Sequence, residues 1–155
     1  MKIRYAEESD LPRLCELHAE LNRLHAAARP DIFRPGTETE TAERLLAMLR
    51  DPDTDVLAAE EDGALCGFAA VKLAARPESA VTREMRDMHI KEICVTRASR
   101  RRGVASALIW QIRCLAREKR CERLELSLWT FNADAAAFYK ALGFSAYKQS
   151  LELRV

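Results

Sequence analysis

The sequence predicts an α/β fold of the mixed (α+β) kind, in which a twisted β-sheet is flanked by helices. Three observations predict this class. Apolar residues recur at helical spacing in four segments, they alternate or run together as in strands in others, and the two kinds of segment are interspersed along the chain. With 155 residues, of which 48% are hydrophobic and 32% charged, the chain is expected to form one domain over residues 1–155.

The first third of the sequence predicts a strand and two helices. Residues 2–5 are expected to form the strand, and a helix N-capped by Ser9 or Asp10 is predicted over residues 11–28. The apolar face of this helix consists of leucines three or four residues apart: Leu11, Leu14, Leu17, Leu21 and Leu24. The segment RPDIFRPG breaks the helix at residues 29–36, and a second helix is predicted over residues 38–50.

The middle of the sequence predicts three strands. Two apolar runs in residues 56–75 flank Asp62-Gly63, a dipeptide that favours a type I′ hairpin turn. Residues 77–87 are polar and are interpreted as a connection. The segment HIKEICV, residues 89–95, alternates as a strand does.

The last third predicts a helix over residues 103–120, a strand over 124–128 and a helix over 133–142. Asn132 is expected to cap the last helix, and Gly143 is placed to end it in the left-handed conformation. Residues 145–154 are expected to close the fold as one or two strands.

The overall charge and the cysteines exclude several classes of protein. A net charge of +1 provides no general attraction for nucleic acid or an anionic membrane, so neither is expected as a partner. The five cysteines have no metal-ligand spacing, and no metal site is predicted. The N-terminal residues lack the apolar core of a signal peptide, and no apolar run is long enough to span a bilayer. A cytoplasmic location is therefore expected.

A basic segment between the predicted strand 89–95 and the predicted helix 103–120 is the first candidate site. Its residues Arg100-Arg101-Arg102-Gly103-Val104-Ala105 lie where a helix presents unpaired N–H groups and the positive end of its dipole. Such a helix terminus binds phosphate. A solvated turn is the alternative interpretation, whereas the sequence lacks the GK[ST] of a P-loop and has too few glycines for a dinucleotide-binding fingerprint.

Two motifs together resemble the GNAT N-acetyltransferase superfamily. R-x-x-G-x-A (Arg100, Gly103, Ala105) resembles its coenzyme A pyrophosphate loop, and residues 132–144 resemble its N-x(5)-FY-x(2)-LGF motif. The resemblance extends over almost the whole chain. It implies a GNAT acyl-CoA N-acyltransferase fold, whose mixed sheet splays near Cys94 to admit acetyl-CoA.

The resemblance also implies how acetyl-CoA, as cosubstrate, would be bound. Backbone amides of the pyrophosphate loop would hold the phosphates, the backbone of the preceding strand would pair with the pantetheine arm, and Asn132 and Tyr139 would contact the coenzyme. The implied coenzyme-binding residues are Ile93, Cys94, Val95, Arg100, Arg101, Arg102, Gly103, Val104, Ala105, Asn132 and Tyr139.

The resemblance assigns catalytic roles to two residues. Tyr139 matches the general acid that protonates the departing thiolate, although its place on an apolar helix face also suits a core aromatic residue. Glu92 matches a position that often holds an acidic residue facing the cleft, and it is the candidate general base. A solvated pair of Glu92 with Lys91 is the alternative, and His89 or a water molecule are other candidates for the base.

Three positions bear on the acceptor and on the details of the site. Ser127 stands where acetyltransferases of ribosomal proteins usually have Glu, and Arg101 stands where glycine is common. Residues 24–35 match the region that shapes the acceptor pocket, so His25 and Phe33 are candidate acceptor contacts.

We therefore expect an acetyl-CoA-dependent N-acetyltransferase that transfers the acetyl group directly to a primary amine. The alternatives are a covalent route through Cys94 and an acyl-CoA-binding sensor or interaction module without turnover. The sequence leaves the acceptor open among small amines, amino acids, antibiotics and protein amines. It also leaves open whether the acyl group is strictly acetyl. The resemblance allows a homodimer, in which terminal strands such as 145–154 pair.

Overall fold

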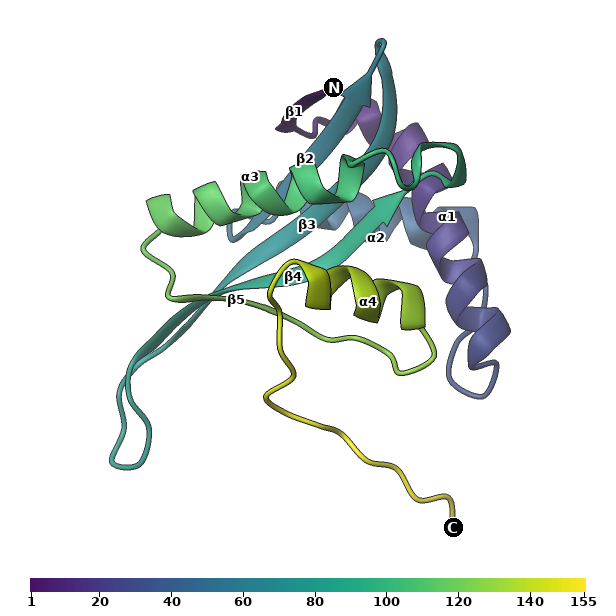
Figure 1. Cartoon of the computed structure of the whole chain (residues 1–155). Coiled ribbons are helices and arrows are strands. Elements are labelled where there is room, and N and C mark those ends of the chain that lie inside the picture. The colour runs from purple at the N-terminus through teal and green to yellow at the C-terminus, as the bar shows by residue number, and fades with distance from the viewer.

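A computed structural model describes residues 1–155, and it places five strands in one mixed sheet of order β1-β2-β3-β4-β5 (Figure 1). All neighbouring strands are antiparallel except β4 and β5, which are parallel. The strands are β1 (Lys2–Tyr5), β2 (Thr54–Glu61), β3 (Ala64–Arg76), β4 (Met85–Val95) and β5 (Arg123–Leu126). The helices are α1 (Leu11–Ala28), α2 (Glu38–Arg50), α3 (Val104–Glu118) and α4 (Ala133–Ala141), with short 3-10 turns η1 (Glu8–Asp10) and η2 (Arg97–Ser99).

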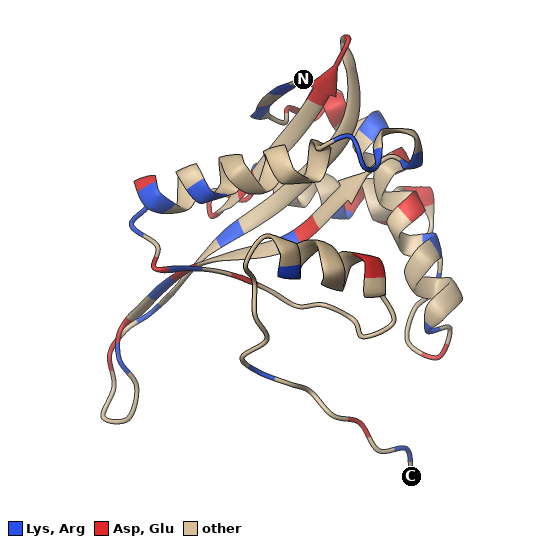
Figure 2. Ribbon diagram, in the orientation of Figure 1, with Lys and Arg blue, Asp and Glu red and all other residues tan.

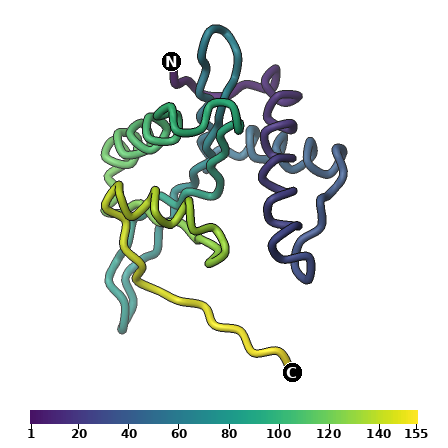
Figure 3. Tube along the Cα trace, turned by 45° about the vertical axis from the view of Figure 1, so that its right-hand side comes forward, coloured from purple at the N-terminus to yellow at the C-terminus, as the bar shows by residue number.

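The helices cover both faces of the sheet, so the protein has two apolar layers. Figures 1 and 3 show α3 and α4 on one face and α1 and α2 on the other. The first layer is a cluster of 14 buried residues under α3, which includes Met88, Leu108 and Tyr139. The second is a cluster of 10 buried residues under α1 and α2, which includes Leu14 and Phe68. This arrangement confirms the predicted fold class.

Local signals in the sequence position several elements correctly. Asp62 and Gly63 have φ values of 52° and 77°, as a type I′ turn requires at both central positions. The Asn132 side chain accepts a hydrogen bond of 3.2 Å from the Ala135 N–H and so caps α4. Gly143 follows this helix with φ 89°, in the left-handed region where glycine is favoured.

Asp10 precedes α1 as predicted, but its side chain does not cap the helix. Its carboxylate instead accepts a hydrogen bond from the Glu7 N–H at 2.8 Å and forms an ion pair with Arg4 at 2.7 Å. The first helix begins at Leu11 and ends at Ala28, as its leucine pattern predicts.

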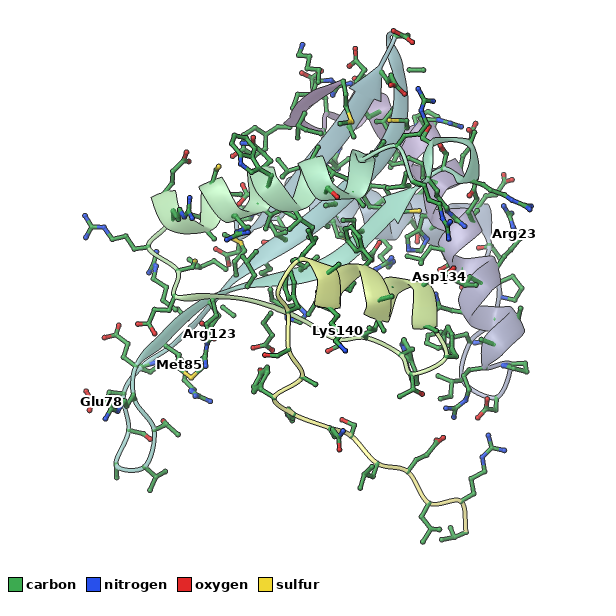
Figure 4. All side chains as sticks on the ribbon, in the orientation of Figure 1. Arg23, Glu78, Met85, Arg123, Asp134 and Lys140 are labelled. Carbon is green, nitrogen blue, oxygen red and sulfur yellow. The ribbon has the colours of Figure 1, made fainter.

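The polar segment 77–87 is only partly a connection, because β4 begins at Met85 rather than at residue 89. Strands β3 and β4 extend together as an arm that carries Glu78 and Met85 (Figure 4). The polarity of this segment has a structural role: buried Asp87 binds Arg123 of β5 through two hydrogen bonds of 2.8 and 3.1 Å. Charged residues near the start of β4 therefore interrupt the alternation of apolar residues by which a strand is predicted.

Residues 145–154 form no strand, although the sequence predicts one or two. The segment runs away from the body of the protein (Figure 3). Its alternate apolar side chains at Tyr147, Leu151 and Leu153 are 68%, 93% and 88% exposed. The outer edge of β5 has no neighbouring strand, so the alternating segment lacks a partner within the chain.

Two irregularities of β4 shape the site. Ala70 pairs with Glu92 and Val71 with Ile90, so Lys91 is an extra residue in a bulge. Pairing of β4 with β5 ends where Ile90 meets Leu126, and the edge of β4 from Lys91 to Val95 is unpaired. The strands thus separate, as expected, although they do so before Cys94 is reached.

None of the helices combines the length and the apolar character that crossing a membrane would need.

Candidate active site

A cleft of about 540 Å³ lies where β4 and β5 separate. Its lining comes from α1, α2, the connection between them, β4, the segment after β5, and α4. It brings together four of the predicted catalytic and coenzyme-binding residues: Glu92, Ile93, Asn132 and Tyr139. These residues are up to 47 positions apart in the chain, and the divergence of two parallel strands places them around one opening.

Glu92 lies at the centre of a buried charge cluster rather than at a solvated edge. Its carboxylate forms an ion pair with Arg44 of α2, and its Oε2 atom lies 3.3 Å from His18 Nε2 of α1. Burial raises the pKa of Glu92, but the close contact with the His18 ring and the charges of Arg44 and His18 outweigh this effect and hold this pKa below its ordinary value. Glu92 is therefore a carboxylate at neutral pH.

Two atoms of this cluster are buried without a hydrogen-bond partner, namely His18 Nδ1 and Glu92 Oε2. Both residues line the cleft. Buried polar atoms without partners are rare in folded proteins and mark places where a functional explanation is needed. The cluster thus has hydrogen-bonding capacity that the fold does not use.

Tyr139 is 7% exposed and packs its ring against Phe138 and Phe144, with centroid distances of 5.2 and 5.4 Å. Burial raises the pKa of its hydroxyl to about 12, with no charged or hydrogen-bonding neighbour contributing. Tyr139 is both a core residue and part of the cleft lining, so the two interpretations of its position are compatible. Its hydroxyl stays protonated at neutral pH.

The loop before α3 presents a row of free N–H groups. No acceptor within the chain binds the N–H groups of Arg101, Arg102, Gly103, Val104, Ala105 or Ser106; the first amide bonded in this region is that of Ala107, to the Gly103 carbonyl at 2.9 Å. Figure 2 shows the positive charge in the same loop, which comes from its arginines. Free amides, a helix N-terminus and positive charge are the three elements of a phosphate site.

The arginine side chains of this loop are partly engaged elsewhere. Arg100 donates to the Val95 carbonyl at 3.2 Å and lies 3.6 Å from Glu20, and Arg102 pairs with Glu61 at 3.0 Å. Arg101 has φ 61°, so the turn does require the left-handed region at the position where glycine is common. The conformation of the loop therefore includes backbone strain at Arg101.

The unpaired edge of β4 connects the cleft with this loop. Ile93 and Val95 pack toward the α3 layer, and Cys94 points to the other face, where its thiol donates to the Leu17 carbonyl at 3.0 Å. Burial raises the pKa of Cys94 to about 12. Cys94 is thus a protonated, hydrogen-bonded core residue.

Of the remaining sequence candidates, His89 lies outside the cleft. Its Nδ1 atom faces Glu125 of β5 at 3.7 Å. Ser127, His25 and Phe33 do line the cleft. No group of three or more His, Cys, Asp or Glu side chains is arranged to hold a metal ion.

Sequence reasoning missed His18, Arg44 and Trp129, all of which line the cleft. His18 carried a weak signal, since it follows Leu17 on the helix and lies four residues after Leu14, within the apolar stripe. Arg44 and Trp129 carried none, because their meeting with Glu92 and Phe33 depends on how α2 and the segment after β5 fold over the sheet.

Comparison with known proteins agrees with this geometry. Residues 14–144 match the Acetyltransferase (GNAT) family. No curated protein matches the sequence significantly. The BH1408 protein from Bacillus halodurans, solved as a tetramutant, is 26% identical, with a TM-score of 0.96 and full coverage of both chains.

Two acetyltransferases of known structure share the fold. Aminoglycoside 6'-N-acetyltransferase AAC(6')-IG from Acinetobacter haemolyticus has a TM-score of 0.79 at 20% identity and covers 100% of this chain and 98% of its own. Aminoglycoside N-acetyltransferase AAC(6')-Iy, solved in complex with CoA, has a TM-score of 0.78 at 19% identity, with coverage of 99% and 93%.

Proposed function

The chain belongs to the GNAT acetyltransferase family, and from this premise we propose that it transfers an acetyl group from acetyl-CoA directly to the primary amine of an acceptor. One observation carries the proposal. The cleft that holds a carboxylate, Glu92, and a protonated phenol, Tyr139, opens beside a free strand edge that leads to a row of free amides. This is the machinery that amine acylation needs: a base, an acid and a place for a phosphate-bearing cosubstrate.

The residues present suit coenzyme A. The free N–H groups from Arg101 to Ala105, with the Arg100 side chain beside them, would hold the pyrophosphate. The unpaired backbone of Ile93, Cys94 and Val95 would pair with the amides of the pantetheine arm as an added strand. Asn132, the N-cap of α4, would be a further contact of the coenzyme. Acetyl-CoA supplies the acetyl group as a reactive thioester.

Glu92 would act as general base. A free amine with a pKa of about 10.4 is protonated at neutral pH and must lose a proton before it attacks. The lowered pKa of Glu92 makes it a weak base, and its carboxylate is buried, so we infer that a water molecule carries the proton.

Tyr139 would act as general acid toward the departing thiolate. Its buried hydroxyl has a pKa of about 12 and is free of internal hydrogen bonds, so it holds a proton that it can donate. Direct transfer is favoured over a covalent route, because the Cys94 thiol is buried, protonated and engaged with a main-chain carbonyl.

The alternative is a domain that binds acyl-CoA as a sensor or interaction module. A screen of primary amines with acetyl-CoA, read by thiol release, separates the two. Binding of coenzyme A without transfer to any amine would favour the module. Because aminoglycoside acetyltransferases share the fold, aminoglycosides belong in the screen with amino acids, small amines and peptide amines.

Tyr139→Phe is the first variant to test with the amine that the screen identifies. We expect kcat to fall about 100-fold, because the acid is removed while the ring that packs on Phe138 and Phe144 is kept. The affinity for coenzyme A, measured by calorimetry, should change little. Because the pKa of Tyr139 is about 12, the ratio of the two kcat values should stay constant between pH 6 and pH 10. An unchanged kcat would remove Tyr139 from the mechanism.

We further infer that two copies associate through residues 145–154. The alternating apolar side chains of this segment are exposed, and the edge of β5 has no neighbour within the chain. Pairing of residues 145–154 with the β5 edge of a second copy would give the free edge a neighbouring strand and would cover the exposed apolar side chains.

A further inference from the structure

We propose that the acceptor is a primary amine on a short alkyl chain attached to an aromatic ring, with one ionisable nitrogen. The inference rests on the proposed acetyl transfer and names the substrate class of that same cleft. Two independent observations carry it: aromatic rings form one wall of the cleft, and the charged side chains of its lining leave no surplus of negative charge for a second ammonium group.

The wall is formed by His25, Phe33 and Trp129. The Phe33 ring lies 5.0 Å from His25 and 5.1 Å from Trp129, in both cases edge to face. Phe131 stacks on Trp129 from outside the lining, at a centroid distance of 6.1 Å. A set of rings that contact one another keeps its shape without a ligand, and it offers the flat apolar surface on which an aromatic group packs.

The Arg29 guanidinium also lies on Trp129, 5.8 Å from the ring centroid. Arg29 is held in turn by Asp31 and by Glu152 of the terminal segment, each at 2.9 Å. Trp129 therefore already has a cation on its ring. A second cation at this ring would be repelled by Arg29, whereas an uncharged aromatic group would not.

The charges of the cleft disfavour a polyamine. The lining has two carboxylates, Glu40 and Glu92, and two basic side chains, Arg44 and Lys91. Glu92 is already paired with Arg44, whereas Glu40 accepts only from the neutral N–H and hydroxyl of Thr37, at 3.0 and 2.9 Å, and keeps its charge. Lys91, which lines the cleft from the bulge of β4, pairs with no carboxylate. The carboxylates and the basic side chains of the lining therefore balance, and a ligand with several ammonium groups would find no surplus of negative charge to offset its repulsion by Lys91 and Arg44.

A single amine meets no such obstacle. Glu92 belongs to the unpaired edge of β4, and Tyr139 lines the same cleft from α4. The ring wall comes from α1, the α1–α2 connection and the segment after β5. An amine that reacts in its neutral form is not repelled by the two cations. A short alkyl chain joins the two parts of the cleft.

The test compares 2-phenylethylamine with spermidine and kanamycin as acceptors, at equal concentration and at pH 8. We expect kcat/KM for 2-phenylethylamine to be at least 10-fold above either polyamine. Trp129→Ala should raise KM for 2-phenylethylamine about 10-fold with kcat little changed, and Trp129→Phe should restore most of the loss. Trp110→Ala, which removes an equal side chain that is 65% exposed on α3, is the matched control and should leave both constants unchanged.

A second measurement does not require turnover. In the Trp110→Phe variant Trp129 is the remaining tryptophan, and titration with 2-phenylethylamine in the presence of coenzyme A should change its fluorescence. If Trp129→Ala fails to fold, Phe33→Leu removes a neighbouring ring of the wall and should raise KM in the same way.

The outcomes distinguish this inference from the proposed function. Transfer to spermidine or kanamycin that equals or exceeds transfer to 2-phenylethylamine would overturn the substrate class and leave acetyl transfer standing. An unchanged KM in both Trp129→Ala and Phe33→Leu would overturn the role of the ring wall. Binding of coenzyme A without transfer to any amine would overturn the proposed function, and this inference with it.

Discussion

Glu92 is the residue whose charge state most affects both the fold and the proposed chemistry. Burial favours its neutral form, and only the contacts with His18 and Arg44 keep it ionised. The carboxylate therefore stabilises the packing of α1 and α2 on β4 while it also borders the cleft. A change at this residue should be visible in stability as well as in activity.

We expect Glu92→Gln to lower the free energy of unfolding by about 2 kcal/mol at pH 7, because it leaves Arg44 and His18 without their anionic partner. The folded pKa lies below the ordinary value of 4.5, so the stabilisation from the carboxylate is present above pH 4.5 and is lost as the pH falls through the folded pKa. Urea unfolding of both proteins at pH 7 and pH 3.5 measures this. The difference in stability should be smaller at pH 3.5 than at pH 7.

Glu16→Gln is the control, because Glu16 lies exposed on α1, where its pair with Arg13 contributes little to stability. A loss of stability in Glu92→Gln that is equal at both pH values would mean that the shape of the side chain matters, and not its charge.

At the scale of elements, the N-terminus of α3 combines two left-handed residues with a row of free amides. Arg101 and Gly103 have φ values of 61° and 85°. A Cβ atom on Gly103 would have no heavy atom within 4 Å among its non-neighbouring residues, so a side chain there meets a backbone penalty rather than a clash within the chain. The two positions therefore allow the strain of the loop to be tested separately from its charge.

Arg101→Gly should raise the free energy of unfolding by about 1 kcal/mol, since glycine adopts this φ without strain. Gly103→Val should lower stability and weaken coenzyme A binding at least 10-fold, whereas Arg102→Ala should weaken binding less. Thermal unfolding and calorimetry of the three variants measure these effects. A coenzyme affinity that survives Gly103→Val but collapses in Arg102→Ala would show that side-chain charge, and not the backbone, holds the phosphates.

The elements also show how far the sequence alone leads. Strand β1 and helix α1 have the predicted bounds, and for α1 the leucine spacing and a proline in the first turn are the local signals. The start of β4 could not be predicted, because its charged residues find partners only in β5 and after α3. The motif residues Asn132 and Tyr139 lie in the cleft with Glu92, but the ion pair that controls Glu92 requires the packing of α2, which no local pattern encodes.

At the scale of the whole molecule, the terminal segment, residues 145–155, contributes little to the packing of the fold. Phe144 packs on the α3 layer, but the residues that follow it bury little and contact the body through Arg29 and Asp31. Removing them should leave both apolar layers intact.

We expect the full chain to sediment as a dimer and the chain truncated after Phe144 to sediment as a monomer. The truncated chain should keep almost the same Tm when both are measured at low protein concentration, because none of the removed residues belongs to a buried cluster. Analytical ultracentrifugation tests the first statement. A full-length monomer, or a truncated dimer, would show that residues 145–154 do not mediate association.

The two apolar layers have a consequence for the order in which the nascent protein acquires structure on the ribosome. Nine of the ten buried residues under α1 and α2 belong to the first 70 positions, and Cys94 is the tenth. The layer under α3 draws its residues from Leu57 to Tyr139. Synthesis therefore delivers one nearly complete half long before the other, and β4 joins them when it emerges. Strand β4, which borders the cleft, thus also joins the part of the protein that is synthesised early to the part that is synthesised late.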